Sequence, residues 1–301
     1  MEGVSPEAAA NSPPAPRWSP AHLAALLMAS LALALGPWFV RLADTGPVAA
    51  GFWRLTLALP VIFALSLREP AERRRVAGGT LALVGGAGAF FALDLASWHV
   101  GIATTKLGNA SLFGNSGSLI LMAWGLIAAR RAPRPLEIAA ILAALGGAAL
   151  LMGGSLEISH ASFVGDLFCL LAGLFYAFYI LMLRPARARL GQFSVLFWST
   201  LTGAPILLAV SYVMGETVLP QNWTPLVVLA MSSQVIGQGL LIYSLKNFTP
   251  LVIGLALLTQ PAVSALTGWL AFGEVLSTGD ILGMMLLAGA LAMAKAGDKP
   301  A

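Results

Sequence analysis

The stretch HLAALLMASLALALGPWFVRL (22–42) decides the fold, because it is almost wholly apolar and holds no acidic residue, lysine or arginine before Arg41. A helix of about 20 such residues is about 30 Å long, which matches the hydrocarbon core of a bilayer. Similar stretches follow along the whole chain, separated by glycine, proline and charged residues. The predicted spans are 22–42, 47–67, 77–102, 108–129, 135–154, 162–184, 193–213, 224–245, 250–272 and 279–297.

Composition excludes a soluble domain. Of the 301 residues, 58% are hydrophobic and only 10% are charged, whereas soluble domains contain about 25% charged residues. The net charge of +4 comes from arginines in short gaps beside apolar stretches, so it indicates orientation in a membrane and no nucleic-acid partner. The single cysteine, Cys169, excludes an intramolecular disulfide.

The basic residues predict the orientation. If the amino terminus is cytoplasmic, the inside gaps hold 14 of the 17 lysines and arginines, and the outside gaps hold only Arg41 and Lys106. The positive-inside rule therefore places both termini in the cytoplasm of a multi-pass protein of the bacterial inner membrane. Residues 1–20 lack a basic n-region and a cleavable apolar segment, so we expect a disordered cytoplasmic tail there and a short cytoplasmic tail at 298–301.

An internal repeat divides the chain. FWRLTLALP (52–60) returns 145 residues later as FWSTLTGAP (197–205), and Arg41 has its counterpart 143 residues later in Arg184. Because each half holds five spans, the halves must insert with opposite orientations. The fold prediction is therefore all-α integral membrane, with ten transmembrane helices as two inverted five-helix repeats over 21–154 and 155–297. The alternative is that both halves merely share the composition of membrane helices.

These residues resemble a known family. The second-span FWRLTLA, the stretch LLTQPAVSALTGWLAFGE (257–274) and the closing ILGMMLLAGALAMA (281–294) are similar to the ten-helix EamA-type branch of the drug/metabolite transporter superfamily. The resemblance implies a central cavity lined by the first, third, fourth, sixth, eighth and ninth spans, and within the branch it is strongest to exporters of aromatic amino acids. Two departures are Arg130–Arg131 in place of a Gly-Glu pair, and Ser118 in place of a midspan proline.

Two interrupted spans indicate a binding site. GNSGS (114–118) lies in the fourth span and TQP (259–261) at the matching part of the ninth. Glycine and proline weaken or remove helix hydrogen bonds, and freed backbone groups are tolerated at membrane depth only inside protein or beside a water-filled cavity. The resulting candidates are Asn115, Ser118 and Gln260 for substrate binding, with Gly114, Gly117 and Pro261 as hinge positions. Close packing of helices through small residues is the alternative.

Asp94 is the only carboxylate well inside a predicted span, where an unpaired charge costs several kcal/mol. Trp98 lies one helical turn further on and His99 follows it, so an acid, an indole and an imidazole share the outer half of this helix. Asp94 is predicted to bind a substrate amine or to exchange a proton. The alternative is a structural hydrogen bond to Arg54, with the arginine side chain reaching toward the membrane surface.

Neutral polar and aromatic side chains complete the candidates. Gln234 and Gln238 are spaced i, i+4, so they share one helix face, and their amides suit a zwitterion without burying net charge. Hydrogen bonding between helices explains them equally well. The aromatic candidates for substrate binding are Trp38, Tyr176, Tyr179 and Tyr243, with Phe91 adding aromatic surface, although each ring also suits ordinary packing.

The absent motifs disfavour other classes. The first span lacks an acid, which disfavours proton-driven export of lipophilic cations as in the small multidrug relatives. No phosphate-binding loop, metal-ligand cluster or nucleophilic constellation is present, so we expect no cofactor, no metal and no enzymatic activity. The sequence predicts a monomeric exporter of small amphipathic metabolites, chiefly aromatic or hydrophobic amino acids, with the bilayer and a small-molecule substrate as partners. The alternatives are a membrane-embedded enzyme acting on lipid, an exporter of nucleobases or drugs, and a nontransporting scaffold or sensor.

Overall fold

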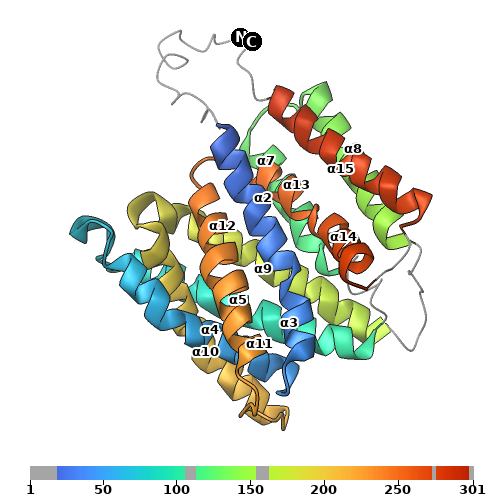
Figure 1. Ribbon diagram of the computed structural model, residues 1–301. Helices are drawn as coiled ribbons and strands as arrows, with labels where there is room; N and C mark the ends of the chain where they lie inside the picture. Colours follow the sequence, from blue (N-terminus) through green and yellow to red (C-terminus); the bar gives the residue numbers. More distant parts are fainter. Residues whose placement is uncertain (1–18, 106–112, 154–162, 273–275, 298–301) are drawn as a thin grey trace.

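The structure, a computed structural model, describes residues 19–105, 113–153, 163–272 and 276–297, and every regular element in those ranges is helical (Figure 1). The elements are α2 (Pro20–Ala34), α3 (Gly36–Leu42), α4 (Pro47–Ser66), η1 (Ala71–Arg73), α5 (Gly79–Thr104), α7 (Ser116–Ala128), α8 (Pro135–Gly153), α9 (Phe163–Arg189), α10 (Gln192–Val213), α11 (Thr224–Leu229), η2 (Ala230–Gln238), α12 (Gly239–Ser244), α13 (Pro250–Leu257), α14 (Gln260–Phe272) and α15 (Thr278–Gly297). The predicted tails at 1–20 and 298–301 lie outside the described residues except for Ser19 and Pro20.

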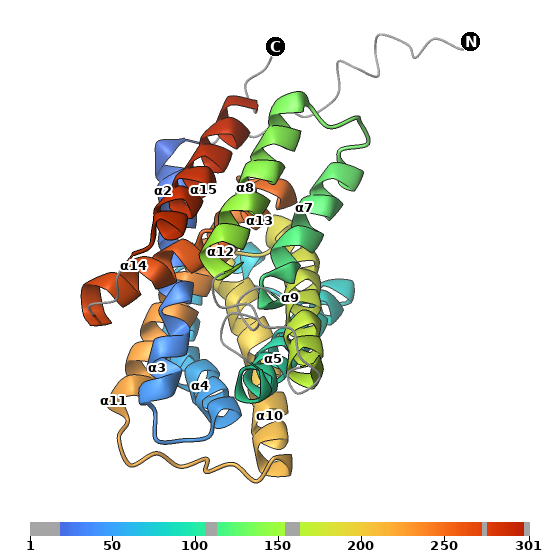
Figure 2. The same cartoon turned by 90° about the vertical axis from the view of Figure 1, so that its right-hand side faces the viewer.

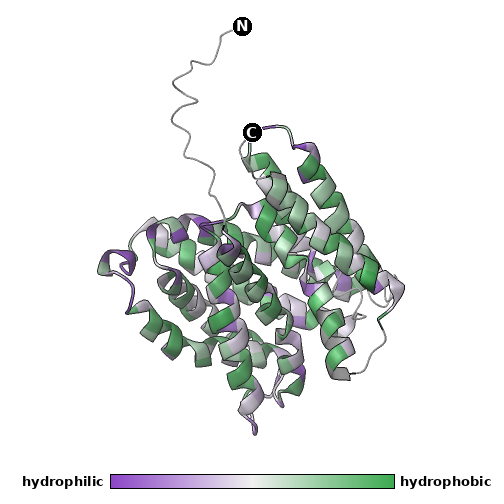
Figure 3. Cartoon of the chain, turned by 45° about the horizontal axis from the view of Figure 1, so that its top comes forward, coloured by the Kyte–Doolittle hydropathy of each residue, from purple (hydrophilic) through white to green (hydrophobic). Residues whose placement is uncertain are grey.

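The chain is a membrane protein by the length and composition of its helices. Among the described residues, six helical segments are long and apolar enough to cross a bilayer: 20–42, 47–66, 79–102, 163–189, 192–213 and 224–244. Four shorter apolar helices, at 116–128, 135–151, 250–263 and 278–294, overlap the other four predicted spans. The first residues of the predicted fourth span, 108–112, lie outside the described residues. Figure 3 shows that hydrophobic residues predominate along the helices.

Helix starts follow from local sequence. The Ser19 hydroxyl accepts from the backbone N–H of His22 at 3.3 Å, and Pro20 occupies the first turn, so Ser19 is the N-cap of α2. The Thr249 hydroxyl caps α13 in the same way, accepting from Val252 N–H at 3.4 Å, with Pro250 following it.

Several spans are interrupted. The predicted helix 22–42 is not continuous, because α2 ends at Ala34 and α3 begins at Gly36, directly before Pro37, which lacks the N–H that a continuing helix needs. The predicted interruption at TQP is confirmed: α13 ends at Leu257 and α14 begins at Gln260. Between α11 and α12 the chain forms the π-helix η2, a local widening that is frequent at functional sites.

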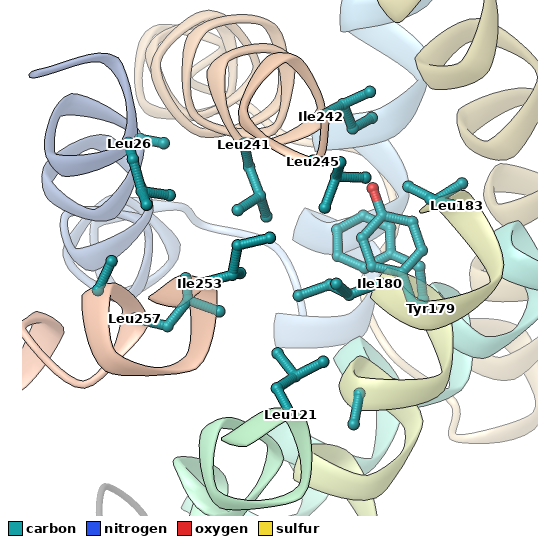
Figure 4. Packing of buried hydrophobic residues seen from close by; sticks show 14 of the residues in the cluster. Leu26, Leu121, Tyr179, Ile180, Leu183, Leu241, Ile242, Leu245, Ile253 and Leu257 are labelled. Atoms are coloured by element: carbon teal, nitrogen blue, oxygen red, sulfur yellow. The ribbon is translucent and has the colours of Figure 1, made fainter. Parts of the chain in front are cut away.

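The helices pack in antiparallel pairs drawn from both halves of the chain. α4 packs on α10, α7 on α13, and α8 on α15, while α5 packs on α9 and α2 on η2. Figure 2 shows α8 and α15 side by side at the edge of the bundle. In Figure 4, apolar side chains from α2, α7, α9, α12 and α13 converge, among them Leu26, Leu121, Ile180, Ile242 and Ile253. The core therefore lies between the halves rather than within each.

The pair α4–α10 is fastened at both ends in the same way. At one end the Glu216 carboxylate accepts from the N–H groups of Val48 (3.2 Å) and Ala49 (2.8 Å), which open α4. At the other end the Glu69 carboxylate accepts from the N–H groups of Phe193 (2.9 Å) and Ser194 (3.1 Å), which open α10. In each case the carboxylate comes from the segment that follows the other helix of the pair. It accepts from N–H groups that have no partner within the helix, and its negative charge lies at the positive end of the helix dipole. We call these two contacts the carboxylate caps.

Glycine makes the carboxylate caps possible. Gly46 and Gly191 are the N-cap residues of α4 and α10, lie 145 residues apart, and share the same extended backbone conformation. A Cβ atom on either would collide with the capping carboxyl group. Gly46 N–H also donates to Thr217 carbonyl, and Gly191 N–H to Arg73 carbonyl, each at 2.9 Å. The two ends are therefore alike in side-chain and backbone contacts.

Removing either cap is expected to destabilise the bundle. Glu69→Ala and Glu216→Ala should each lower the free energy of unfolding by about 1–2 kcal/mol, because a capping acceptor and a favourable charge at a helix N-terminus are lost together. The measurement is the thermal unfolding midpoint of the detergent-solubilised protein. Glu72→Ala is the matched control, since Glu72 is exposed in the same segment as Glu69; an equal decrease in that variant would contradict the capping role.

Candidate functional site

A cavity of about 190 Å³ lies where α2, α3, α4, α5, α7, α9, η2, α13 and α14 approach one another. Its lining brings together ten of the residues predicted for substrate binding or hinge motion: Asp94, Trp98, His99, Gly114, Asn115, Ser118, Tyr176, Gln238, Gln260 and Pro261. None of the described residues of α8 and α15 lines this cavity. The second span also contributes, through Gly51 and Arg54, which the resemblance did not imply.

Asp94 lies half-buried on α5 and faces this cavity. Within the described part of the chain its carboxylate makes no hydrogen bond and has no basic nitrogen within 4 Å. Arg54 lines the same cavity from α4. Because the Asp94 carboxyl group has no partner among the described residues, its oxygens are available to a ligand in the cavity.

Arg54 does not reach for the membrane surface. It is buried, with 8% of its surface exposed, and its Nε donates to Gln234 Oε1 at 3.1 Å, while Gln234 Nε2 donates to Thr200 Oγ1 at 3.0 Å. Its guanidinium carbon also lies 5.4 Å from the centre of the Phe91 ring, a cation–π distance. The alternatives of a snorkelling Arg54 and of an Arg54–Asp94 hydrogen bond are thus wrong, because the apolar surroundings and Gln234 hold the guanidinium inside.

The two glutamines on η2 have different positions. Gln234 is fully buried between Arg54 and Thr200 and does not line the cavity, so the interhelical hydrogen-bond interpretation fits it. Gln238 lines the cavity, and its Oε1 accepts from the Tyr179 hydroxyl at 3.1 Å. The π-helix places both amides on the side that faces α4 and α9.

Aromatic rings form one wall. The Phe91 and Tyr179 rings are stacked with centroids 4.6 Å apart, and Tyr176 follows at 5.9 Å from Tyr179. Phe91 and Tyr176 line the cavity, whereas Tyr179 is fully buried behind them. About two turns beyond Phe91 on the same helix α5, the Trp98 indole packs against Gly114, where a Cβ atom would lie 3.2 Å from Trp98 Nε1. The site therefore combines flat apolar surfaces with a few polar groups.

The broken helices deliver the remaining polar groups. Asn115 is the N-cap of α7 and Ser118 lies in its first turn; Gln260 and Pro261 open α14. Gly117 faces away from the cavity, because a Cβ atom there would lie 2.5 Å from the Gly173 carbonyl oxygen of α9. Close helix packing therefore accounts for Gly117, as the alternative interpretation stated.

Besides Tyr179, two more aromatic candidates lie outside the cavity lining. Trp38 is 36% exposed on α3 and stacks on Phe39, next to the cavity residue Pro37. Tyr243 lies on α12 with its ring 5.8 Å from the His22 ring, near the start of α2. Trp38 and Tyr243 were predicted because they are aromatic and lie in spans expected to line the cavity. Residue type and span do not determine the side of the helix on which a residue lies.

His99 is buried, and its Nδ1 atom has no hydrogen-bond partner among the described residues. Its Cε1 side lies against Gly51, where a Cβ atom would be 3.6 Å away.

Sequence reasoning did not propose Arg54 for substrate binding. The signal that identifies it is the rule that an ionisable residue inside a membrane span faces the bundle interior or a water-filled cavity.

Comparisons with known proteins give a family match and a likeness of fold. Residues 163–295, less than half of the chain, match the EamA-like transporter family. No curated protein matches the chain. One solved structure, described only as the crystal structure of a protein, is similar with a TM-score of 0.79 and 17% identity over 93% of this chain and 99% of that one, a likeness of fold. The match of the second half to EamA-like transporters supports the resemblance of the chain to the drug/metabolite transporter superfamily.

Proposed function

We propose that the protein exports small amphipathic metabolites across the bacterial inner membrane, with aromatic or hydrophobic amino acids as its preferred substrates. The observation that carries the proposal is the cavity in which the Asp94 carboxylate and the Arg54 guanidinium lie beside the aromatic side chains of Phe91, Trp98 and Tyr176. Ionisable groups inside apolar helices are costly and mark substrate pathways. A transporter family matches the second half of the chain, which favours transport over an enzyme acting on lipid.

The charges suit a zwitterion. The substrate ammonium binds Asp94, and the substrate carboxylate binds the guanidinium nitrogens of Arg54 that Gln234 does not occupy. Gln238, Asn115 and Gln260 line the same cavity and add neutral donors and acceptors. Because each substrate charge meets an opposite protein charge, binding adds no net charge to the apolar interior.

The rest of the cavity suits a flat apolar side chain. Phe91, Tyr176 and Trp98 offer ring faces, and a cavity of about 190 Å³ is smaller than the roughly 300–1,000 Å³ of pockets that take drug-sized ligands. The shape and size therefore favour a single amino acid over a larger drug.

Alternating access follows from an inverted repeat with ten membrane crossings. Three observations support this architecture: α4, α7 and α8 each pack on the helix at the same place in the other half, the carboxylate caps are alike at the two ends of α4–α10, and the helices break at Asn115 and before Gln260. In such repeats the substrate site lies near the midplane between the halves. Rocking of one half against the other exposes Asp94 and Arg54 to each side in turn.

The test is counterflow in liposomes. Liposomes that contain the protein and are loaded with unlabelled phenylalanine should accumulate labelled phenylalanine transiently, and excess tryptophan or leucine should compete better than aspartate or lysine. Protein-free liposomes and liposomes with the Arg54→Met variant are the controls. Equal counterflow of lysine and phenylalanine would contradict the zwitterion site, and absence of counterflow for every amino acid would contradict the substrate class.

The proposed orientation is tested by labelling single cysteines in a Cys169→Ala background. Cysteines placed at Ala71 and Ala188, both exposed, should react with a membrane-impermeant maleimide only in inverted vesicles, and one placed at the exposed Gln221 only in intact cells. The reason is that arginines surround the first two positions and not the third. Labelling of Ala71→Cys in intact cells would reverse the orientation.

A further inference from the structure

A second cavity, of about 400 Å³, lies at the end of the bundle where α10 begins. It is bounded by the end of α4, the segment that contains η1, and the turn from α9 to α10. Arg68, Arg73 and Arg187 line it, together with Glu69 and Gln192. It lies at the opposite end of α4 from the Glu216 cap and is separate from the site around Asp94.

Arg187 is the unusual member of this cavity. It is 7% exposed, and its Nη1 donates to the Leu190 carbonyl at 3.0 Å, but its Nε has no hydrogen-bond partner among the described residues. No carboxylate of a described residue lies within 4 Å of its guanidinium. A buried guanidinium without a counterion is costly, and the positive-inside rule does not require burial. An anion in the cavity would balance this charge.

Glu69 does not fill this role. It is the acidic residue among those that line the cavity, and both of its oxygens accept hydrogen bonds at the start of α10, from Phe193 N–H, Ser194 N–H and the Ser194 hydroxyl. Glu69 thus acts on Arg187 only through space, while both of its oxygens are engaged at the start of α10.

Other cations add to the positive field. Burial, followed by the charges of Arg187 and Arg73, lowers the pKa of Lys246, which lies just beyond the end of α12. Arg68 and Arg73 are exposed at the rim, so an incoming anion meets mobile cations first and the buried Arg187 last. Planar, fixed guanidinium donors suit the oxygens of a phosphate group, which they contact in pairs.

We propose that this cavity is a binding site for a phosphate-type oxyanion, with Arg187 as its buried donor and Arg68 and Arg73 closing over the ligand. The phosphate belongs to the headgroup of an anionic phospholipid or to a soluble phosphate. Both share the chemistry that the arginines recognise, and the position at the proposed cytoplasmic end of the helices is within reach of both.

The test uses the purified full-length protein in a nonionic detergent. Its thermal unfolding midpoint is measured at constant ionic strength while chloride is replaced by inorganic phosphate, and separately while short-chain phosphatidylglycerol or phosphatidylcholine is added. We expect the midpoint to rise with phosphatidylglycerol, phosphate or both, and not with phosphatidylcholine. A rise with phosphatidylglycerol alone identifies a lipid headgroup, and a rise with phosphate identifies a soluble ligand.

The variants locate the site. Arg187→Gln should weaken the binding about 10- to 100-fold, because charged hydrogen bonds from a buried group are lost, and the exposed Arg73→Gln should weaken it up to about fivefold. Arg75→Gln, which changes the same charge in the same segment outside the cavity, should have no effect. If Arg187→Gln does not fold, Arg73→Gln and Arg68→Gln still decide. Absence of any stabilisation by either ligand, or equal effects of Arg73→Gln and Arg75→Gln, would overturn the site.

Discussion

Arg54→Met is expected to reduce phenylalanine transport by about 100-fold, since a charge-assisted hydrogen bond to a substrate carboxylate in a buried site contributes up to about 3 kcal/mol. Arg54 lines the cavity from α4, and Gln234 fixes it through Nε. The measurement is the initial rate of counterflow per reconstituted protein. Arg54→Lys should recover only part of the activity, because an ammonium cannot both bond to Gln234 and present a fork to the substrate.

A double variant separates substrate binding from structural support. Arg54→Met alone leaves the buried Gln234 Oε1 without its donor, which costs about 1–3 kcal/mol of stability. Arg54→Met combined with Gln234→Met removes the unpaired amide and leaves only the Thr200 hydroxyl without its former donor, so the unfolding midpoint should recover in part. If Arg54 binds substrate, transport stays low in the double variant. Recovery of transport together with stability would show that Arg54 serves only the contact between α4 and η2.

The parts of the fold that depend on local composition could be predicted from the sequence. The length of the apolar stretches predicts the spans. The Thr259–Pro261 segment predicts a helix break, because proline has no N–H to donate to the preceding turn. The break at Leu35 carries the same signal in Gly36–Pro37. It was missed because the surrounding run is apolar enough to be taken as one helix.

The rotational placement of side chains could not be predicted. A helix that is apolar all round has no periodicity to show which face is inside, so Trp38 and Tyr243 were grouped with Tyr176 although only Tyr176 lines the cavity. Long-range partners were equally hidden. The Glu69 and Glu216 caps join segments more than 120 residues apart, and Gln234 rather than Asp94 is the partner of Arg54.

Asp94 is expected to tolerate asparagine and not leucine. Asp94→Leu removes the acceptor for the substrate ammonium and should lower counterflow of phenylalanine by about 10- to 100-fold, whereas Asp94→Asn keeps an acceptor of similar size and should remain within about tenfold of the wild type. A deaminated analogue, 3-phenylpropionate, distinguishes binding from folding. Its weak transport should be unaffected or improved in both variants, because it has no ammonium for Asp94 to bind.

The same variants decide whether transport is coupled to protons. A carboxyl that cycles a proton must ionise, so in a proton-coupled exporter Asp94→Asn would abolish the response to a pH gradient while leaving downhill exchange intact. We expect no such response in the wild type, because in the proposed site the substrate ammonium and carboxylate meet Asp94 and Arg54 of the same cavity, so that substrate binding itself needs no proton. Initial rates with and without a gradient test this in liposomes. A gradient effect that is present in the wild type and lost only in Asp94→Asn would overturn facilitated diffusion and make Asp94 the proton carrier.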